Sequence, residues 1–222
     1  MKKSNLLALL LLSASSASFA QTVYDDFNLK QWNIIKEGTG PTIQEANQRL
    51  EITLPANSKD GSNAIFYAGY SSKCVLQGNF DIQFDYSLLK FPSYSGVRAG
   101  ITIPSVITVA RESFSQHDDG FTAGEFYIVG GDAFTSVPTS DKKGKLRVAR
   151  NNGVVSGYFF DATLKAWQLI GSSSVSIDNV PFQIWVWSHD SRFDDKSAKV
   201  AFDNIIVNSG NLAGVQCPFT AP

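Results

Sequence analysis

The stretch NFDIQFDYSLL, residues 79–89, places two carboxylates, Asp81 and Asp85, among alternating large apolar residues. In a β-strand they share one face with Gln83 and lie roughly 13 Å apart, because each residue adds about 3.3 Å. A retaining glycosidase needs its two carboxyl groups about 5–5.5 Å apart, and an inverting one about 6.5–9.5 Å. Asp81 and Asp85 therefore cannot be catalytic partners of each other without a bulge, although either could pair with a carboxylate from another strand.

The segment PFQIWVWSHD, residues 181–190, suggests a different chemistry, the stacking of sugar rings on aromatic side chains. Its aliphatic residues alternate with Gln183, Trp185 and Trp187, so a strand here has one aliphatic face and one that carries both tryptophans. The two indoles would stand about 6–7 Å apart, which suits adjacent pyranose rings. The alternative is that both tryptophans pack under a loop or fill a second layer of the core.

A carbohydrate site also needs polar side chains that hydrogen-bond to hydroxyl groups. The residues that we expect to supply these bonds are Gln83, Asp85, Arg98, Arg147 and Tyr158. Arg147 has a simpler alternative role, because an arginine on a polar strand face commonly pairs with an acidic residue of the next strand, here Asp85 or Asp161.

Short alternating runs between turn signals make up the chain after residue 20, and no segment has a convincing helical period. RLEITL places its three aliphatic side chains on one strand face. Asn152 and Gly153, between two β-rich runs, indicate a type I′ hairpin whose register brings Arg150 nearly opposite Val155. The pattern predicts an all-β fold, a two-sheet antiparallel β-sandwich.

The chain is expected to form one domain over residues 21–210, because no linker or repeat divides them. Residues 1–20 have a basic start, a short apolar core and small residues before the cleavage point, the features of a secretory signal peptide without a lipid anchor. We therefore expect a secreted or periplasmic protein. Residues 211–222 are expected to form an irregular tail, tethered by a disulfide between Cys74 and Cys217, the only two cysteines; the alternative is two thiols that do not pair.

The charge pattern excludes some partners. Without its first 20 residues the chain has 17 basic and 20 acidic residues, a formal charge of −3, and no basic block or stripe. Nucleic acid is therefore not an expected partner, and neither is an anionic membrane surface. The apolar run at the start is too short to span a bilayer, so no membrane insertion is expected.

Three stretches carry a family resemblance: YDDFN followed by Trp32, GKLRVARNNGVVSGYF followed by AWQLIG, and VAFDNIIVNSG. Together they resemble the concanavalin A-like lectin/glucanase superfamily, in particular its secreted laminin-G-like jelly rolls, over most of residues 23–209. The resemblance implies two curved sheets, adjacent first and last strands, and a concave face open to ligand. It also implies a structural Ca²⁺ near the joined termini, with Asp203 and either Asp25 or Asp26 among its oxygen ligands. Alternatively, Asp203 only satisfies backbone groups at a strand end.

The glucanases of this superfamily carry Glu-x-Asp-x-x-Glu on one strand, whereas no glutamate in this chain is followed by aspartate two residues later. We therefore expect a carbohydrate-binding, lectin-like domain without catalysis. Its expected ligand-binding residues are Gln83, Asp85, Arg98, Arg147, Tyr158, Trp185 and Trp187. Two alternatives stay open: a glycosidase or polysaccharide lyase with an unfamiliar site, and a protein-interaction or adhesion module of the envelope or secretome.

Overall fold

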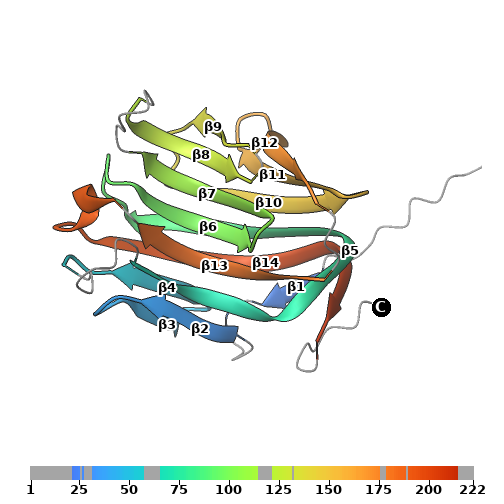
Figure 1. The fold of residues 1–222 in the computed structure, drawn as a ribbon, viewed down its shortest axis with the longest axis horizontal. Helices are drawn as coiled ribbons and strands as arrows, with labels where there is room; N and C mark the ends of the chain where they lie inside the picture. Colours follow the sequence, from blue (N-terminus) through green and yellow to red (C-terminus); the bar gives the residue numbers. More distant parts are fainter. Residues whose placement is uncertain are drawn as a thin grey trace, which may run out of the picture.

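The computed structural model of the chain describes residues 22–25, 27, 32–57, 66–114, 122–131, 133–175, 179–188 and 190–214. Across these ranges the chain forms fourteen β-strands, one 3₁₀ turn at Ser191–Phe193 and no α-helix. Every strand pairing is antiparallel. The strands lie in two layers, with β6, β7, β8 and β13 over β10 and β14 (Figure 1). The predicted all-β sandwich is confirmed.

One strand, β5 (Phe66–Lys90), belongs to both layers. Its first half pairs with β13 and β2, and its second half pairs with β10 and β14. Between the two halves lies Gly78, whose φ of 58° is in the left-handed region that glycine adopts without steric cost. The sequence patterns predict two separate strands here, whereas the structure has one continuous strand that passes from sheet to sheet.

We call the two layers sheet I and sheet II. Sheet I contains, in spatial order, β2 (Trp32–Glu37), the first half of β5, β13 (Val180–Ser188), β6 (Val97–Ile103), β7 (Ile107–Phe114), β8 (Gly124–Gly130) and β9 (Thr135–Pro138). Sheet II contains β12 (Ala166–Ser174), β11 (Val154–Asp161), β10 (Lys143–Asn151), the second half of β5, β14 (Ala198–Ala213), β4 (Arg49–Leu54) and β3 (Thr42–Ala46). The first strand, β1 (Thr22–Asp25), pairs with β14, so the first and last strands are adjacent as expected.

The core lies between the sheets and is built largely by side chains that alternate along each strand. In β5, Ile82 and Phe84 are fully buried, and from sheet I Phe182 and Ile184 of β13 join the same apolar cluster. The aliphatic side chains of RLEITL are also fully buried, as predicted. Burial of each such side chain contributes about 1.5–3 kcal/mol, so the alternation fixes which strand faces point outward.

The predicted hairpin is confirmed. Asn152 and Gly153 have φ angles of 49° and 80°, both positive as a type I′ turn requires, and Arg150 lies directly opposite Val155. The backbone N–H of Asn152 donates a hydrogen bond of 2.9 Å to the side-chain oxygen of Asn79. This bond ties the β10–β11 turn to β5 just after its bend.

The described residues include only part of the two ends of the chain. Residues 1–20 and Cys217 lie outside them, so the signal peptide and the disulfide stay predictions; Cys74 is fully buried in β5. Strand β14 continues to Ala213, three residues into the segment expected to be irregular, because Leu212 pairs with β5 and packs on the core. Within the described part of the chain, no helix has the length and apolar character needed to cross a membrane.

Candidate functional site

Asp81 and Asp85 face outward from sheet II, and each is paired with a cation of the neighbouring strand β10. Arg147 Nε donates to Asp81 Oδ1 at 2.8 Å, and a second guanidinium nitrogen reaches the other carboxylate oxygen. Lys145 Nζ lies 2.6 Å from Asp85 Oδ1. Cross-strand ion pairs therefore account for both carboxylates. The predicted partner of Arg147 is wrong: Arg147 lies opposite Gln83 and reaches diagonally to Asp81 rather than to Asp85 or Asp161.

Arg147 is also held from the other side by aromatic rings. Its guanidinium carbon lies 5.3 Å from the ring centroid of Tyr158 and 5.5 Å from that of Trp167, distances at which cation–π attraction acts. Asn208 Nδ2 donates to both Asp81 Oδ1 and Gln83 Oε1 at 3.0 Å. The polar groups of this outer face are therefore largely bonded to one another.

The outer face of sheet I has a different character. We call it the tryptophan face, and its members are Tyr67, Arg98, Thr102, Glu112, Phe126, Trp185 and Trp187. One row across the strands runs Tyr67, Trp187, Arg98, Glu112, Phe126 in direct register. Trp187 packs with Ala110 and Ile128 in an apolar cluster separate from the main core, and Trp185 packs against that cluster. The sandwich thus has a second aromatic layer on one of its outer faces.

Trp185 lies in register between two glycines, Gly69 on one side and Gly100 on the other. A Cβ built on Gly69 would stand 2.4 Å from the Cβ of Trp185, so the glycine is needed for this close approach. The indole Nε1–H donates to Thr102 Oγ1 at 2.9 Å. Trp185 is therefore fixed in orientation by a hydrogen bond, and its two cross-strand neighbours have no side chains.

The two tryptophans are stacked on each other, with ring centroids 4.6 Å apart and an interplanar angle of 22°. Tyr67 contacts Trp185 edge-on at 5.3 Å. Trp187 is only 7% exposed, whereas Trp185 is half-buried. The pair therefore forms one aromatic surface in which Trp185 is the more accessible ring, rather than the two separate platforms that the sequence suggests.

A charged pair borders these rings. Arg98 Nε lies 2.8 Å from Glu112 Oε1, and the Arg98 guanidinium stands 5.9 Å from the centre of Trp187. The side chain of Glu112 is only 2% exposed, although it belongs to an outward-facing row. Sequence reasoning missed Glu112; its only local signal is that it alternates with outward-facing Ala110 and Thr108 along β7.

The seven residues predicted to bind ligand do not form one site. Gln83, Asp85, Arg147 and Tyr158 lie on the outer face of sheet II, and Arg98, Trp185 and Trp187 lie on the outer face of sheet I. Alternation predicts correctly which residues of one strand share a face. It does not predict which sheet each strand joins, because strand pairing is decided by contacts distant in sequence.

The predicted calcium ligands are only partly placed. Asp203 Oδ1 accepts a 2.8 Å hydrogen bond from the backbone N–H of Asn204, whose φ is 50°. Asp25 is opposite Ile205 in the β1–β14 pair, and Asp26 lies outside the described residues. Within the described ranges, no group of three or more histidine, cysteine or acidic residues is arranged to hold a metal ion. The Asp203 geometry fits its backbone-satisfying alternative role, and calcium stays a prediction.

The sequence matches no protein-family model and no curated protein. Solved structures are similar in fold. The catalytic domain of a GH131 β-glucanase from Podospora anserina aligns with a TM-score of 0.62 at 10% identity, over 88% of this chain and 99% of that one. Peanut lectin aligns at 0.55 and 11% identity, over 88% and 99%. The lumenal domain of VIP36, in a Ca²⁺/Man-bound form, aligns at 0.52 and 8% identity, over 85% and 94%.

These matches define the fold: the chain is a concanavalin A-like jelly roll, as the sequence resemblance implies. At such low identity the likeness extends to the fold alone, and the matched proteins include both lectins and a glucanase. What this chain does must therefore be argued from its own site.

Proposed function

We propose that the protein binds carbohydrate through the tryptophan face, without catalysis. The observation that carries this proposal is the aromatic layer of Trp185, Trp187 and Tyr67 outside the main core, bordered by the Arg98–Glu112 pair. Aromatic faces pack against the C–H surfaces of pyranose rings, and planar charged groups hydrogen-bond to their hydroxyls. The outer face of sheet II is the weaker candidate, because its rings Tyr158 and Trp167 already pack against Arg147, whereas Trp185 has no cation against it among the described residues.

The polar residues at the edge of the tryptophan face also suit a carbohydrate ligand. Thr102 Oγ1 and Thr108 Oγ1 lie 2.9 Å apart, next to the indole nitrogen of Trp185. A shallow pocket of about 370 Å³ adjoins both threonines. Hydroxyl groups that both donate and accept hydrogen bonds suit a ligand made of hydroxyls.

The test compares two tryptophan variants on opposite faces. Intrinsic fluorescence is titrated with a panel of soluble polysaccharides for the parent protein, for Trp185→Ala and for the control Trp167→Ala. We expect a saturable shift with at least one glycan, weakened at least tenfold, or about 1.4 kcal/mol, in Trp185→Ala but not in Trp167→Ala. Equal loss in both variants, or no shift with any glycan in a folded protein, would refute the proposal and favour a protein-interaction role.

A glycosidase is the second candidate, because Glu112 is a buried carboxylate in the same cross-strand row as Trp187, with Arg98 between them. Glu37 occupies the same row, four strands away, which places it roughly 19 Å from Glu112 at about 4.8 Å per strand. That separation exceeds the roughly 9.5 Å limit for an inverting pair. Release of reducing ends that stops in Glu112→Gln while glycan binding persists would establish catalysis instead.

The proposal also includes export of the protein from the cytoplasm and the binding of a calcium ion. The signal-like residues 1–20 support a secreted or periplasmic protein that meets glycans outside the cytoplasm. We propose that a structural Ca²⁺ at Asp203 stabilises the fold where the first and last strands, β1 and β14, pair. This ion takes no part in ligand binding. A protein partner at the loop ends is the remaining alternative.

A further inference from the structure

A groove of about 770 Å³ opens beside the start of β10 and the end of β11, away from the tryptophan face. Its volume lies within the range of about 300–1,000 Å³ found for small-molecule sites. It shares no lining residue with the tryptophan face. The residues that give it chemical character are Tyr86, Tyr127, Asp141, Gly144, Phe159 and Asp161.

A chain of hydroxyl groups forms one wall. Tyr127 donates to Asp141 Oδ2 at 2.7 Å, and the hydroxyl oxygens of Tyr86 and Tyr127 are 2.8 Å apart. Because the Tyr127 proton is used on Asp141, Tyr86 donates to Tyr127, and its oxygen, which Arg111 also approaches, acts as an acceptor. Burial raises the pKa of Tyr86 to about 12 and raises the pKa of Tyr127 further, so both phenols stay neutral at ordinary pH.

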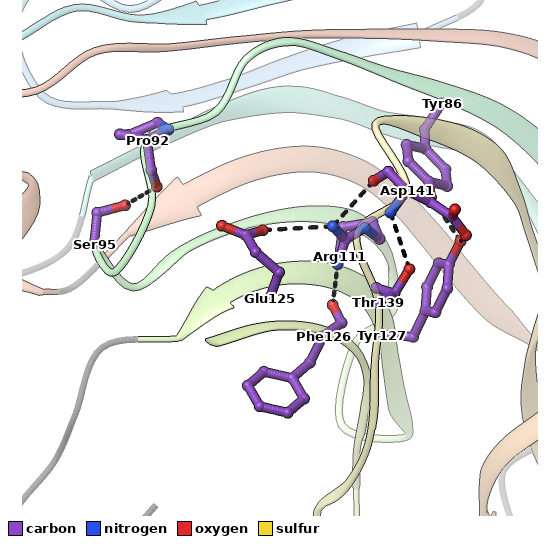
Figure 2. Close-up of polar contacts among 9 residues, drawn as sticks. All are labelled: Tyr86, Pro92, Ser95, Arg111, Glu125, Phe126, Tyr127, Thr139 and Asp141. Carbon is purple, nitrogen blue, oxygen red and sulfur yellow. Dashed lines mark hydrogen bonds and ion pairs between the residues drawn. The ribbon is translucent and has the colours of Figure 1, made fainter. Parts of the chain in front are cut away.

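Arg111 holds this wall in place from behind. It is fully buried and donates to the backbone oxygens of Phe126 at 2.6 Å and of Asp141 at 3.1 Å. Figure 2 shows Arg111 joining β8 to the loop that carries Asp141, and its guanidinium carbon lies 5.1 Å from the centre of the Tyr127 ring. The acceptor end of the hydroxyl chain is therefore part of a fixed framework.

Gly144 makes room for the Tyr86 side chain at the wall of the groove. It lies directly opposite Tyr86 in the β10–β5 pair, and a Cβ at this position would stand 3.0 Å from the Tyr86 hydroxyl oxygen. Glycine inside a strand is unfavourable unless something must approach the backbone closely. Here the group that approaches the backbone of Gly144 is the ring edge and hydroxyl of Tyr86 itself.

The remaining walls fit an uncharged ligand. Phe159 stacks on Tyr127 with centroids 4.3 Å apart, which gives the groove an aromatic wall. Its carboxylates already have partners: Asp85 pairs with Lys145, and Asp161 accepts from two backbone N–H groups of the following turn. Lys143 also lines the groove, and its side chain is exposed to solvent.

We propose that this groove is a second binding site, which takes the end of a neutral saccharide with a ligand hydroxyl donating to Tyr86 and a ring face against Phe159. The site goes beyond the tryptophan face and does not depend on it. It would let one domain hold a glycan chain at two places, or hold two chains.

The test is a titration of the ¹⁵N-labelled full chain with cellotriose, maltotriose and laminaritriose, followed by amide chemical shifts. We expect saturable shifts at Gly144 and at residues 139–141 with at least one of the three. Gly144→Ala should weaken this binding at least fivefold, because its methyl group crowds the Tyr86 hydroxyl that accepts from the ligand. Tyr86→Phe should weaken it about threefold to tenfold through loss of one hydrogen-bond acceptor.

Two matched controls separate this site from other effects. Gly130→Ala adds the same methyl group to a strand glycine whose Cβ would meet no atom within 4 Å, and should leave the binding unchanged. Trp185→Ala should also leave it unchanged, even where it abolishes binding at the tryptophan face. The proposal is overturned by an absence of saturable shifts in the groove, by shifts that survive Gly144→Ala, or by shifts that disappear in Trp185→Ala.

Discussion

Replacement of Arg147 by alanine should destabilise the protein by about 2 kcal/mol without affecting glycan binding. Arg147 lies between Asp81 and the rings of Tyr158 and Trp167, so it joins three strands of sheet II. If the tryptophan face is the ligand site, this arrangement on the opposite face serves stability alone. Arg147→Ala then lowers the free energy of unfolding and leaves the glycan affinity as it was.

The magnitude follows from three contacts. The side chains of Arg147 and Asp81 are 26% and 14% exposed, so solvent screens their ion pair and limits it to about 0.5–1 kcal/mol. Each partly exposed cation–π contact adds about 0.5–1 kcal/mol. For a domain of this size, a loss of about 2 kcal/mol lowers Tm by about 4–8 °C.

Lys145→Ala is the matched control. Lys145 is on the same strand face and also pairs with an aspartate, but its side chain is 38% exposed and no aromatic ring of the described residues stacks on it. It should cost at most about 1 kcal/mol. Urea unfolding of both variants, and of Arg147→Lys, measures the difference; the lysine keeps the charge and loses the planar stack. If Arg147→Ala costs no more than Lys145→Ala, the stack contributes nothing and the reasoning fails.

Three further outcomes can be measured. The pKa of Tyr86 is raised from 10 to about 12, so its contribution of about 3 kcal/mol to the free energy of unfolding is complete below pH 10 and is lost as pH rises toward 12. In urea unfolding between pH 9 and 12, the free energy of unfolding should therefore fall less steeply with pH in Tyr86→Phe than in the parent protein. Parallel declines in the two proteins would contradict this. If Cys74 and Cys217 are bridged, thiol labelling of the unfolded, unreduced mature chain finds no thiol, and reduction lowers stability by up to about 5 kcal/mol; labelling of two thiols would exclude the bridge. If calcium is bound, EDTA lowers Tm and added Ca²⁺ restores it, whereas an unchanged Tm removes the site.

Local sequence patterns predict much of the fold because β-strands and turns are encoded locally. Alternation predicts the buried face of RLEITL, and Asn152-Gly153 predicts both the turn type and the pairing of Arg150 with Val155. The bend of β5 is not predicted. A single Gly78 between two good strand patterns looks like a connection, and only pairing with partners from both sheets makes it a bend within one strand.

The candidate site is less predictable for the same physical reason. Trp185 and Trp187 can be found from composition and alternation, but the close approach of Trp185 to β5 depends on Gly69, which comes from another strand. The pairing of Glu112 with Arg98 likewise depends on the register of β6 and β7. Residue types predict what a site could bind, whereas register between distant segments decides which residues meet.

The two outer faces of this sandwich differ in how far their side chains are already bonded to one another, and this difference separates a face that stabilises the fold from one that binds a ligand. On sheet II the charged and aromatic side chains bond to one another, and a ligand would have to break Arg147–Asp81 or Lys145–Asp85 before it gained anything. On sheet I the half-buried Trp185 has glycines as its two cross-strand neighbours and is oriented by Thr102. Burying that remaining indole surface under a sugar requires no bond to be broken and no side chain to be reordered. Preorganisation of this kind lowers the cost of binding, which is why recognition is assigned to sheet I although sheet II has more polar groups.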